Sequence, residues 1–399
     1  MKILLFHQFY TRSNEAGISR FNTLAKYWKK QGVELTVVSG SVNYLTGEKV
    51  GRLEGGEGVR VIRVWSSSFG LGYRTFPGRI LSYASFTLSA FFVGLFVSRP
   101  DLVLASSPPI SIGAVAAVVS RLRRIPFVFE VRDMWPDDAI ELGFIKNGFL
   151  ISFSYALERF VNRSVRKIIV NSPGIKEFLM QKKEILEHKI GVVENPVEIM
   201  RVDPSELRAS LGWQNKTVFI YTGSHSFVYD FDSVLDVAQE MNDGQTLFVF
   251  VGDGRQKPHI AERIKKENIS NVILLDPVPA SDVQRYVQAA DVGIAVLKGL
   301  PRLRFVYATK VFDYMAGRLP IVLAMEGVTA ELVKKSKSGI VVPSENRGLL
   351  KEAFEKMREP ETRKRLGEAG FKYLSENYKA EDLALRYLSL LEPVIVPKG

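Results

Sequence analysis

Four cationic side chains stand close together in one loop of this 399-residue chain. They are Lys298, Arg302, Arg304 and Lys310, and they follow the apolar run Val292 to Val296, which has the composition of a buried parallel strand. Open α/β sheets hold their ligands just beyond the carboxyl ends of such strands. Positive charge at that place is typical of a site for a phosphate or diphosphate.

A short helix is predicted directly after this loop, from Val311 to Gly317, with Lys310 immediately before it. The free N–H groups of a helix start would add to the attraction for a diphosphate. Asp313 suits the two hydroxyls of a ribose, as the acidic residue of dinucleotide sites does. The same residues also agree with an ordinary solvated loop in which Asp313 complements the helix dipole, so both interpretations stay open on this stretch alone.

Two turns rich in glycine follow other predicted strands. V-F-V-G-D-G and Y-T-G-S-H each place glycine directly after an apolar run, where a backbone can come close to a flat or anionic group. In both cases a tight strand-to-helix turn is the alternative. The two turns contribute six candidate binding residues: Gly223, Ser224, His225, Gly252, Asp253 and Gly254.

Carboxylates gather after the predicted strand Phe127 to Val131 in the first half of the chain. Asp133 is the candidate for acting on a reacting hydroxyl, as a positioned carboxylate can. We interpret Asp137 and Asp138 as helix caps and Arg132 as part of an internal salt bridge.

Little in the sequence favours a metal or a redox cofactor. The chain has no cysteine and only four histidines, which excludes disulfides and Cys-ligated zinc. Asp230-Phe231-Asp232 matches a D-x-D pattern for divalent cations, but Asp232 comes just before a predicted helix and we interpret it as a cap. The loop after the first strand has no G-x-G-x-x-G, which disfavours nicotinamide and flavin enzymes. We therefore expect no cofactor and no metal.

The elements that must position these residues alternate between strand and helix along the whole chain. This alternation predicts an α/β fold with two Rossmann-like parallel-sheet domains facing across a cleft. The expected boundaries are 1–195 for the first domain and 196–379 for the second, with 196–216 as a polar linker and a helix in 380–399 that packs back on the first domain. The predicted strands are Lys2–Phe6, Leu35–Val38, Val59–Val64, Leu102–Ala105, Phe127–Val131, Lys167–Val170, Ile190–Val193, Thr217–Tyr221, Leu247–Val251, Val272–Leu275, Val292–Val296, Ile321–Ala324 and the run G-I-V-V before Pro343.

The positive charge of the chain belongs to its first half. The net charge is +11, and residues 1–195 carry 26 Lys and Arg against 16 Asp and Glu, while the remainder carries 28 against 27. Such asymmetry indicates an anionic partner or surface for the first half. Within it, Ile80 to Ser98 is nineteen residues long without a charge, which reaches the threshold for a spanning helix. We interpret it as a buried or interfacial helix, because Ser and Thr dilute its apolarity.

Taken together, these residues resemble the family 4 glycosyltransferases of the two-Rossmann-domain, or GT-B, type, over nearly the whole chain. The stretches that carry the resemblance are K-I-L-L-F, V-F-E-V-R-D-M-W-P, I-I-V-N-S-P-G-I, V-V-E-N-P-V, F-V-F-V-G-D-G, A-A-D-V-G-I-A-V-L and T-K-V-F-D-Y-M-A-G-R-L-P-I-V. Two of them, V-R-D-M-W-P and K-V-F-D-Y-M, are similar to the subgroup that builds bacterial surface polysaccharides, including the N-acetyl-L-fucosamine transferases of O-antigen and capsule.

The resemblance implies a nucleotide sugar bound mainly by the second half, an acceptor bound by the first, and transfer with retention of configuration. Gly17 would approach the diphosphate from the first loop, and Arg20 is placed with it among the substrate-binding residues. Val278 would lie near the base. Asp313 takes the place of the second Glu of the family's E-x7-E pattern, the ribose ligand.

Three departures from the family pattern stand out. Phe305 occupies the position of the first Glu of E-x7-E, so that sugar contact is missing. The family's frequent histidine in the acceptor domain falls near Asp133. The usual Arg and Lys pair after Y-T-G is absent, so Lys310 with Arg302 and Arg304 must supply that charge.

The expected activity is transfer from a UDP-sugar to a polyprenyl-diphosphate-linked acceptor, with Lys310 and Asp133 as catalytic residues. The expected location is cytoplasmic, peripheral on the inner face of the cytoplasmic membrane, where the first half would contact anionic lipid. A nucleotide-sugar epimerase and an inactive sugar-nucleotide-binding partner protein remain alternatives. A nucleic-acid partner is not expected, since the cations are not interleaved with stacking aromatics.

Overall fold

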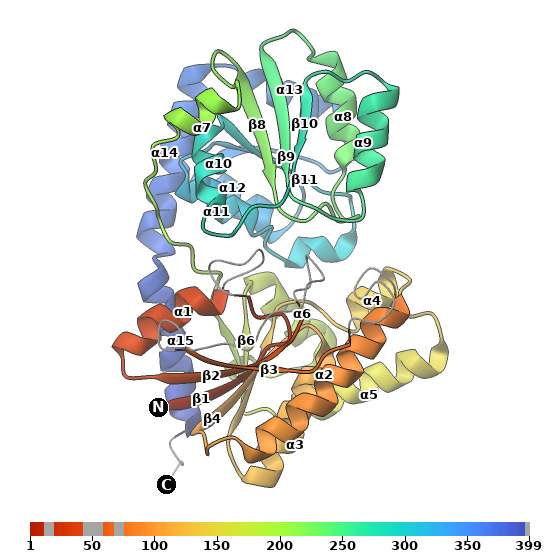
Figure 1. The fold of residues 1–399 in the computed structure, drawn as a ribbon, viewed down its shortest axis with the longest axis vertical. Helices are drawn as coiled ribbons and strands as arrows, with labels where there is room; N and C mark the ends of the chain where they lie inside the picture. Colours follow the sequence, from red (N-terminus) through yellow and green to blue (C-terminus); the bar gives the residue numbers. More distant parts are fainter. Residues whose placement is uncertain (12–19, 43–58, 68–75, 396–399) are drawn as a thin grey trace. The chain divides into compact units, whose positions relative to one another are not determined.

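The structure is a computed structural model, and it describes residues 1–11, 20–42, 59–67 and 76–395. The chain divides into two compact units (Figure 1). Unit 1 holds the described residues up to Pro196 together with the described segment from Ala380 onward, and unit 2 holds Val197–Lys379. The C-terminal helix thus belongs with the first sheet, not with the second.

Unit 1 is built on a parallel sheet. Its described residues form seven strands in the order β3-β2-β1-β4-β5-β6-β7. The strand order reverses between β1 and β4, which is where open α/β sheets hold ligands. Every residue of β4 and β5 is buried, as expected for strands covered on both faces. The strands are β1 (Lys2–Phe6), β2 (Glu34–Gly40), β3 (Val59–Val64), β4 (Leu102–Ser106), β5 (Phe127–Val131), β6 (Lys167–Val170) and β7 (Ile190–Val192).

Helices cover both faces of this sheet, because right-handed crossovers that run in opposite directions along it emerge on opposite faces. α3 (Ile110–Arg123) packs between α2 (Phe76–Phe96) and α5 (Gly148–Ser164) in one layer, while α1 (Arg20–Lys30) packs on α15 (Ala380–Ile395). Smaller elements are α4 (Asp137–Glu141), α6 (Pro173–Lys183) and the 3-10 helix η2 (Glu187–Lys189).

The charge-free stretch of the sequence forms most of α2. Its segment Gly78–Phe96 is long and apolar enough to cross a membrane by length and composition, and 28% of it is buried inside unit 1. Phe86 and Ala90 are buried, whereas Leu88 and Phe92 on other sides of the helix are exposed. α2 is therefore packed on the sheet along one side and presents an apolar outer side.

Unit 2 contains a second parallel sheet. Its six strands run in the order β10-β9-β8-β11-β12-β13, and the order reverses between β8 and β11. The strands are β8 (Thr217–Thr222), β9 (Thr246–Val251), β10 (Val272–Leu275), β11 (Val292–Val296), β12 (Ile321–Ala324) and β13 (Gly339–Val342). The helices are α7 (Ser205–Ser210), α8 (Phe231–Glu240), α9 (Lys257–Lys266), α10 (Val283–Ala289), the 3-10 helix η3 (Pro301–Phe305), α11 (Lys310–Ala316), α12 (Val328–Ser336), α13 (Arg347–Lys356) and α14 (Pro360–Asn377).

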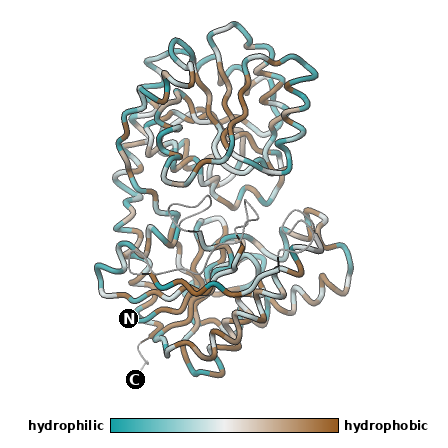
Figure 2. Tube along the Cα trace, viewed as in Figure 1, coloured by the Kyte–Doolittle hydropathy of each residue, from teal (hydrophilic) through white to brown (hydrophobic). Residues whose placement is uncertain are grey.

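The predicted α/β class with two parallel sheets is confirmed, and the strands of each unit are the most hydrophobic parts of the chain (Figure 2). The prediction of a plain linker over 196–216 is wrong in one respect. This stretch contains α7, Trp213 is fully buried, and Arg208 forms an ion pair with Asp291 at 2.9 Å. One large apolar side chain and one ion pair attach the stretch to unit 2.

Candidate functional site

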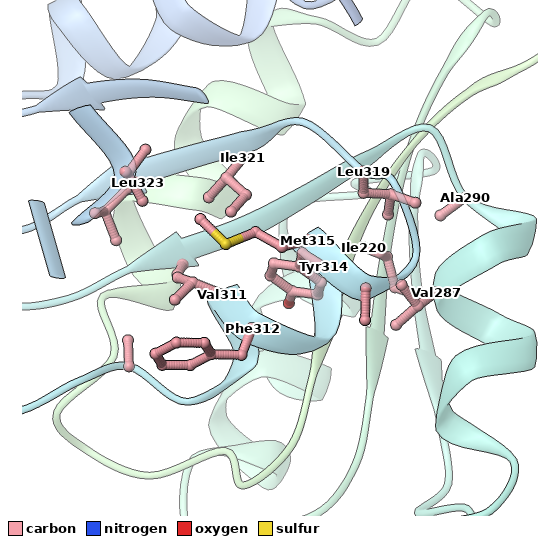
Figure 3. Packing of buried hydrophobic residues seen from close by; sticks show 14 of the residues in the cluster. Ile220, Val287, Ala290, Val311, Phe312, Tyr314, Met315, Leu319, Ile321 and Leu323 are labelled. Atoms are coloured by element: carbon pink, nitrogen blue, oxygen red, sulfur yellow. The ribbon is translucent and has the colours of Figure 1, made fainter. Parts of the chain in front are cut away.

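The short helix α11 is held rigidly at the point where the strand order of unit 2 reverses. Figure 3 shows its apolar side chains packed into the core. The Tyr314 hydroxyl donates to the Ile294 carbonyl at 3.1 Å and accepts from the Thr222 N–H at 3.2 Å, so it ties α11 to β11 and β8. Gly293 makes this possible, because a Cβ there would lie 2.3 Å from the Tyr314 ring. This packing places Lys310 at the carboxyl ends of the central strands.

Lys310 is a buried cation surrounded by aromatic rings. Only 6% of it is exposed, and its Nζ donates to the Tyr229 hydroxyl at 2.6 Å. The Nζ lies 4.0 Å from the Tyr229 ring centroid and 4.4 Å from that of Tyr221. In the described part of the chain no carboxylate forms an ion pair with it. A buried ammonium without a counter-ion is costly, so this arrangement favours an anionic ligand.

Tyr229 reaches Lys310 because two loops at the switch point are joined. Tyr229 and Leu297 form an isolated antiparallel bridge, and the Asp230 N–H donates to the Val296 carbonyl at 3.0 Å. The Lys298 N–H in turn donates to the Val228 carbonyl at 2.9 Å. The loop after β8 is thereby paired with the loop after β11. The sequence analysis did not identify Tyr229 as a site residue.

The glycine turns after β8 and β9 pack backbone against backbone. A Cβ on Gly252 would lie 1.9 Å from the Gly223 carbonyl oxygen, so no other residue fits without displacing that loop. The His225 N–H donates to the Asp253 carbonyl at 2.8 Å, and the Gly254 N–H donates to the Asp253 carboxylate at 2.8 Å. The glycines were predicted to let the backbone come close to a ligand. In the structure they let the two loops pack against each other.

His225 is fully buried beside this junction. Within the described ranges neither of its ring nitrogens has a hydrogen-bond partner. Burial, with the charges of Lys257 and Lys310, lowers its pKa to about 4, although Asp253 opposes the shift. The ring is neutral near pH 7. Both of its nitrogens are covered by the protein, so the predicted contact of His225 with a phosphate is not formed by the ring as it stands in this structure.

Asp313 lies one turn beyond Lys310 on α11 and is partly buried. Burial raises its pKa to about 7, and the Lys310 charge only partly opposes this. Its carboxylate titrates near neutral pH, which makes its hydrogen bonding to a ligand hydroxyl depend on pH.

Other predicted residues of unit 2 have different surroundings. Arg302 is buried in η3, whereas Arg304 is exposed and lies 5.7 Å from the Phe305 ring. Ser224 is exposed, and Val278 packs against the core. Of the four predicted cations, Lys310 is the one whose ammonium is placed in the aromatic cluster by the contacts described above.

Two N–H groups near the start of α11 already have acceptors in the protein. The Val311 N–H donates to the Ala308 carbonyl at 3.0 Å, and the Phe312 N–H donates to the Thr309 carbonyl at 3.1 Å. The Lys310 side chain adds positive charge at the same place, and the binding of a diphosphate by this helix start stays a prediction.

Unit 1 has its own polar cluster at the carboxyl ends of β1 and β5. Arg132 Nη1 lies 3.1 Å from His7 Nε2, and the Arg132 N–H donates to the Ser107 hydroxyl at 3.2 Å. Burial, together with the Arg132 charge, lowers the His7 pKa to about 3, so the ring is neutral. Burial also raises the pKa of Asp133, the next residue, while Arg132 opposes the shift. Asp133 thus stands where a carboxyl group could accept a proton.

Three predictions for the unit 1 cluster need correction. Arg132 contacts His7 instead of a carboxylate partner. Asp137 forms an ion pair with Lys183 at 2.6 Å, and Asp138 accepts from the Met134 N–H, so neither caps the helix that begins at Asp137. His7 was missed, although its place directly after the first buried strand could have indicated it.

The D-x-D segment also differs from its prediction. Asp230, not Asp232, caps α8, and its carboxylate accepts from the Ser233 N–H and hydroxyl. Asp232 instead pairs with Arg263 at 2.8 Å and lies 2.9 Å from His259. Arg263 also pairs with Asp236 and Glu267, so Asp232 belongs to a partly buried ion-pair network between α8 and α9.

Arg20, predicted among the substrate-binding residues, is buried and forms its hydrogen bonds with oxygens of the protein. Its Nε donates to Glu130 at 2.9 Å, Nη1 to Glu194 O at 2.6 Å and Asn195 Oδ1 at 2.9 Å, and Nη2 to Val193 O at 2.8 Å. These bonds tie α1 to β5 and to the end of β7, and we assign Arg20 a structural role. Gly17 lies outside the described residues.

Comparison with known proteins gives two family matches. A model described as glycosyl transferase 4-like domain matches residues 17–196, and one described as glycosyl transferases group 1 matches residues 203–373. A relative named as a colanic acid biosynthesis glycosyl transferase, WcaI of Escherichia coli (strain K12), is 23% identical over 206 residues. That match spans 49% of this chain and 50% of the relative's length.

Solved structures give the same fold. HepE of Anabaena, in complex with UDP and glucose, is 16% identical with a TM-score of 0.71, over 98% of this chain and 100% of that one. WaaG, a glycosyltransferase involved in lipopolysaccharide biosynthesis, is 13% identical with a TM-score of 0.69, over 100% of both chains. At these identities the likeness establishes the fold, and the expected GT-B class is confirmed.

Proposed function

The chain belongs to the glycosyltransferases that join a 4-like domain to a group 1 domain, and from this premise we propose that it transfers a sugar from a UDP-sugar to an acceptor. The observation that carries the proposal is Lys310, a buried ammonium at the switch point of unit 2 with no carboxylate partner in the described chain. A nucleoside diphosphate ester supplies the missing negative charge. Structures of HepE hold UDP and UDP-glucose, which supports a uridine donor for this chain.

In this proposal unit 2 holds the donor without a metal. Lys310 donates to the diphosphate, next to the glycine turns that follow β8 and β9. Asp313 accepts hydrogen bonds from the ribose hydroxyls, and Val278 lies toward the base. As the bond to the sugar breaks, Lys310 stabilises the growing charge on the leaving diphosphate.

The transfer step exchanges one carbon–oxygen bond for another. The bond from the anomeric carbon to the diphosphate oxygen breaks, and UDP leaves with the electron pair. An acceptor hydroxyl oxygen forms the new bond on the same face of the sugar, so the configuration is retained. The hydroxyl proton must be taken up, and Asp133 is the proposed group, since burial raises its pKa and makes its carboxylate a stronger base.

The proposed acceptor is a polyprenyl-diphosphate-linked saccharide of bacterial surface polysaccharide synthesis. The proposed location is the inner face of the cytoplasmic membrane, where such an acceptor is anchored by its lipid. Support comes from the names of the relatives, which place WcaI in colanic acid biosynthesis and WaaG in lipopolysaccharide biosynthesis. The positive charge of residues 1–195 agrees with an anionic surface.

The test begins with ligand binding. Thermal unfolding is measured with UDP, GDP and a panel of their sugars, and we expect a rise in Tm with UDP and at least one UDP-sugar. The UDP-sugar that binds is then incubated with lipid-linked acceptors, and the anomeric configuration of the product is determined by NMR. A rise in Tm with GDP and its sugars alone would overturn the uridine assignment.

The two alternatives have separate outcomes. If incubation with the donor alone yields an isomeric nucleotide sugar, the protein is an epimerase. Binding that is retained while transfer and hydrolysis stay at background identifies an inactive binding protein. The second outcome would point to Phe305, which replaces the acidic sugar ligand of the family pattern.

A further inference from the structure

A surface cavity of about 770 Å³ lies on unit 1 where the ends of α3 and α5 meet the starts of β5 and β6. It is far from the polar cluster of unit 1, because Phe127 at the first position of β5 lines it whereas Asp133 follows the last. A strand of five residues spans roughly 17 Å. The cavity is therefore separate from the site described above.

Five arginines line this cavity, and none of its lining residues is acidic. The one acidic residue of α5, Glu158, is buried and paired with Lys183 at 2.9 Å. Clustered guanidinium groups without carboxylates produce a strong positive potential and suit planar, bidentate recognition of phosphate oxygens. The arginines, all exposed, are Arg121, Arg124, Arg159, Arg163 and Arg166.

Favourable interaction with the helix dipoles explains only part of this cluster. Arg121 and Arg163 lie in the last turns of α3 and α5, where cations stabilise a helix end. Arg124 and Arg166 lie beyond those helices, and Arg159 lies before the last turn of α5. Arg166 donates to the Val394 carbonyl at 3.2 Å, and Arg124 is the C-cap residue of α3. Of the five arginines, Arg159 is the one whose place neither a helix end nor this hydrogen bond explains.

Large apolar side chains are exposed on the same layer of helices. α3 packs between α2 and α5, so the outer sides of the three helices form one surface, at the lower right of unit 1 in Figure 1. α2 has a single charged residue, Arg79, and α3 has only arginines as charged residues. The most exposed apolar side chains of this surface are Leu88, Phe92, Phe96, Leu122, Phe149 and Phe153, each at least half exposed.

We infer that the arginine cavity binds the phosphate headgroups of anionic phospholipids, and that unit 1 docks on a bilayer through the surface of α2, α3 and α5. The inference rests on the membrane location given under the proposed function, and it identifies the surface that contacts the membrane. The arginines bind lipid phosphates, while Phe and Leu side chains enter the boundary between headgroups and acyl chains. Both kinds of contact are needed for stable peripheral binding.

Vesicle co-sedimentation of the whole chain tests this inference. Wild type is compared on phosphatidylcholine vesicles with and without about 30 mol% phosphatidylglycerol. The cavity variant replaces four exposed arginines: Arg121→Gln, Arg124→Gln, Arg159→Gln and Arg163→Gln. The control variant removes the same charge from exposed positions of unit 2: Lys265→Gln, Lys266→Gln, Lys334→Gln and Lys364→Gln.

Wild type should bind only the anionic vesicles. Each cation at an anionic surface contributes roughly fivefold, so the loss of four should lower the partition coefficient of the cavity variant roughly 600-fold and that of the control less than about threefold. Equal losses in the two variants, or an unchanged cavity variant, would overturn the inference. Unaltered thermal unfolding and UDP binding in the cavity variant separate this result from misfolding and from failure of the donor site.

Two further arms distinguish other occupants. Inorganic phosphate at about 10 mM and constant ionic strength should not displace wild type from vesicles, because it lacks the apolar contacts. If phosphate alone raises the Tm of wild type but not of the cavity variant, and vesicles do not bind, the site is one for a free anion. If light scattering shows a dimer that the Phe96→Ser and Phe153→Ser changes dissociate, without vesicle binding, the surface is an interface between copies.

Discussion

Each unit has a buried cation near the carboxyl ends of its strands, Arg20 in unit 1 and Lys310 in unit 2, and the protein neutralises the two differently. In unit 1, Arg20 is 4% exposed and donates to Glu130 and to three further oxygens of the protein. In unit 2, Lys310 is 6% exposed and donates to one oxygen, the Tyr229 hydroxyl, with aromatic rings around the rest. Arg20 is neutralised by the fold, whereas Lys310 is left for a ligand.

This difference distinguishes a buried charge that stabilises the fold from a buried charge that binds a ligand. A buried ion pair with all its hydrogen bonds made holds elements together, and removing one partner leaves the other charge uncompensated. A buried cation that the protein does not neutralise lowers stability and is retained for binding. The exposed fractions of Arg20 and Lys310 are alike, so burial alone would not distinguish the two roles.

The largest expected effect is on folding. Arg20→Met should lower the free energy of unfolding by about 3–5 kcal/mol, because it leaves Glu130 buried without its partner. Lys310→Met should change it by less than about 1 kcal/mol, or raise it, since the lost charge had no carboxylate partner in the described chain. Urea unfolding followed by circular dichroism measures both. Similar losses in the two variants would contradict the comparison.

The next effect is on transfer. Lys310→Met should lower kcat/KM for the UDP-sugar on the order of a hundredfold, because a single donor to a developing oxyanion contributes that much. Lys334→Met, an exposed lysine on α12, is the control and should leave kcat/KM within about twofold. Initial rates with saturating acceptor measure the effect. A loss under threefold for Lys310→Met would remove this residue from the reaction.

A smaller effect concerns pH. Asp313 has a pKa raised to about 7 by burial, so it is mostly protonated at pH 6 and mostly ionised at pH 8. The ionised carboxylate accepts stronger hydrogen bonds from the ribose hydroxyls, and UDP-glucose affinity should therefore rise about fivefold over this range. UDP-glucose is the ligand of choice because its diphosphate diester does not titrate there. Calorimetry should show no such rise in Asp313→Asn.

The strands were predictable from sequence because buried parallel strands are continuous apolar runs bounded by polar turns. β1, β3, β5 and β11 begin and end at the predicted residues. Lys310 and Asp313 were predictable as candidates because they lie at the start of the helix that follows a central strand, and such a helix starts at the ligand edge of the sheet.

Contacts between distant segments were not predictable in this way. Tyr229 stands 81 residues before Lys310, and it arrives there through the bridge to Leu297. Arg20 seemed available to a substrate because its neighbours in sequence are loop residues, but Glu130 and Asn195, which bind it, are 110 and 175 residues away. The local sequence pattern predicts the helix, strand or loop that carries a side chain, whereas the residues that contact this side chain depend on the tertiary fold.

The smallest effect concerns one hydroxyl group in each unit. The Tyr229 hydroxyl accepts from the buried cation Lys310, and the Ser106 hydroxyl donates to Glu130, the partner of the buried cation Arg20. Tyr229→Phe removes the hydroxyl that accepts from Lys310 at 2.6 Å and keeps the ring 4.0 Å away. Without that bond the Lys310 ammonium is less well positioned, and kcat/KM should fall about three- to tenfold with little change in stability.

The matched change in unit 1 is Ser106→Ala, which removes the hydroxyl that donates to Glu130 at 2.6 Å. This change should lower stability by about 1–3 kcal/mol and leave kcat/KM within about twofold, since Ser106 serves the structural pair. A Tyr229→Phe variant that unfolds more easily but transfers normally would show that Lys310, too, is a structural cation.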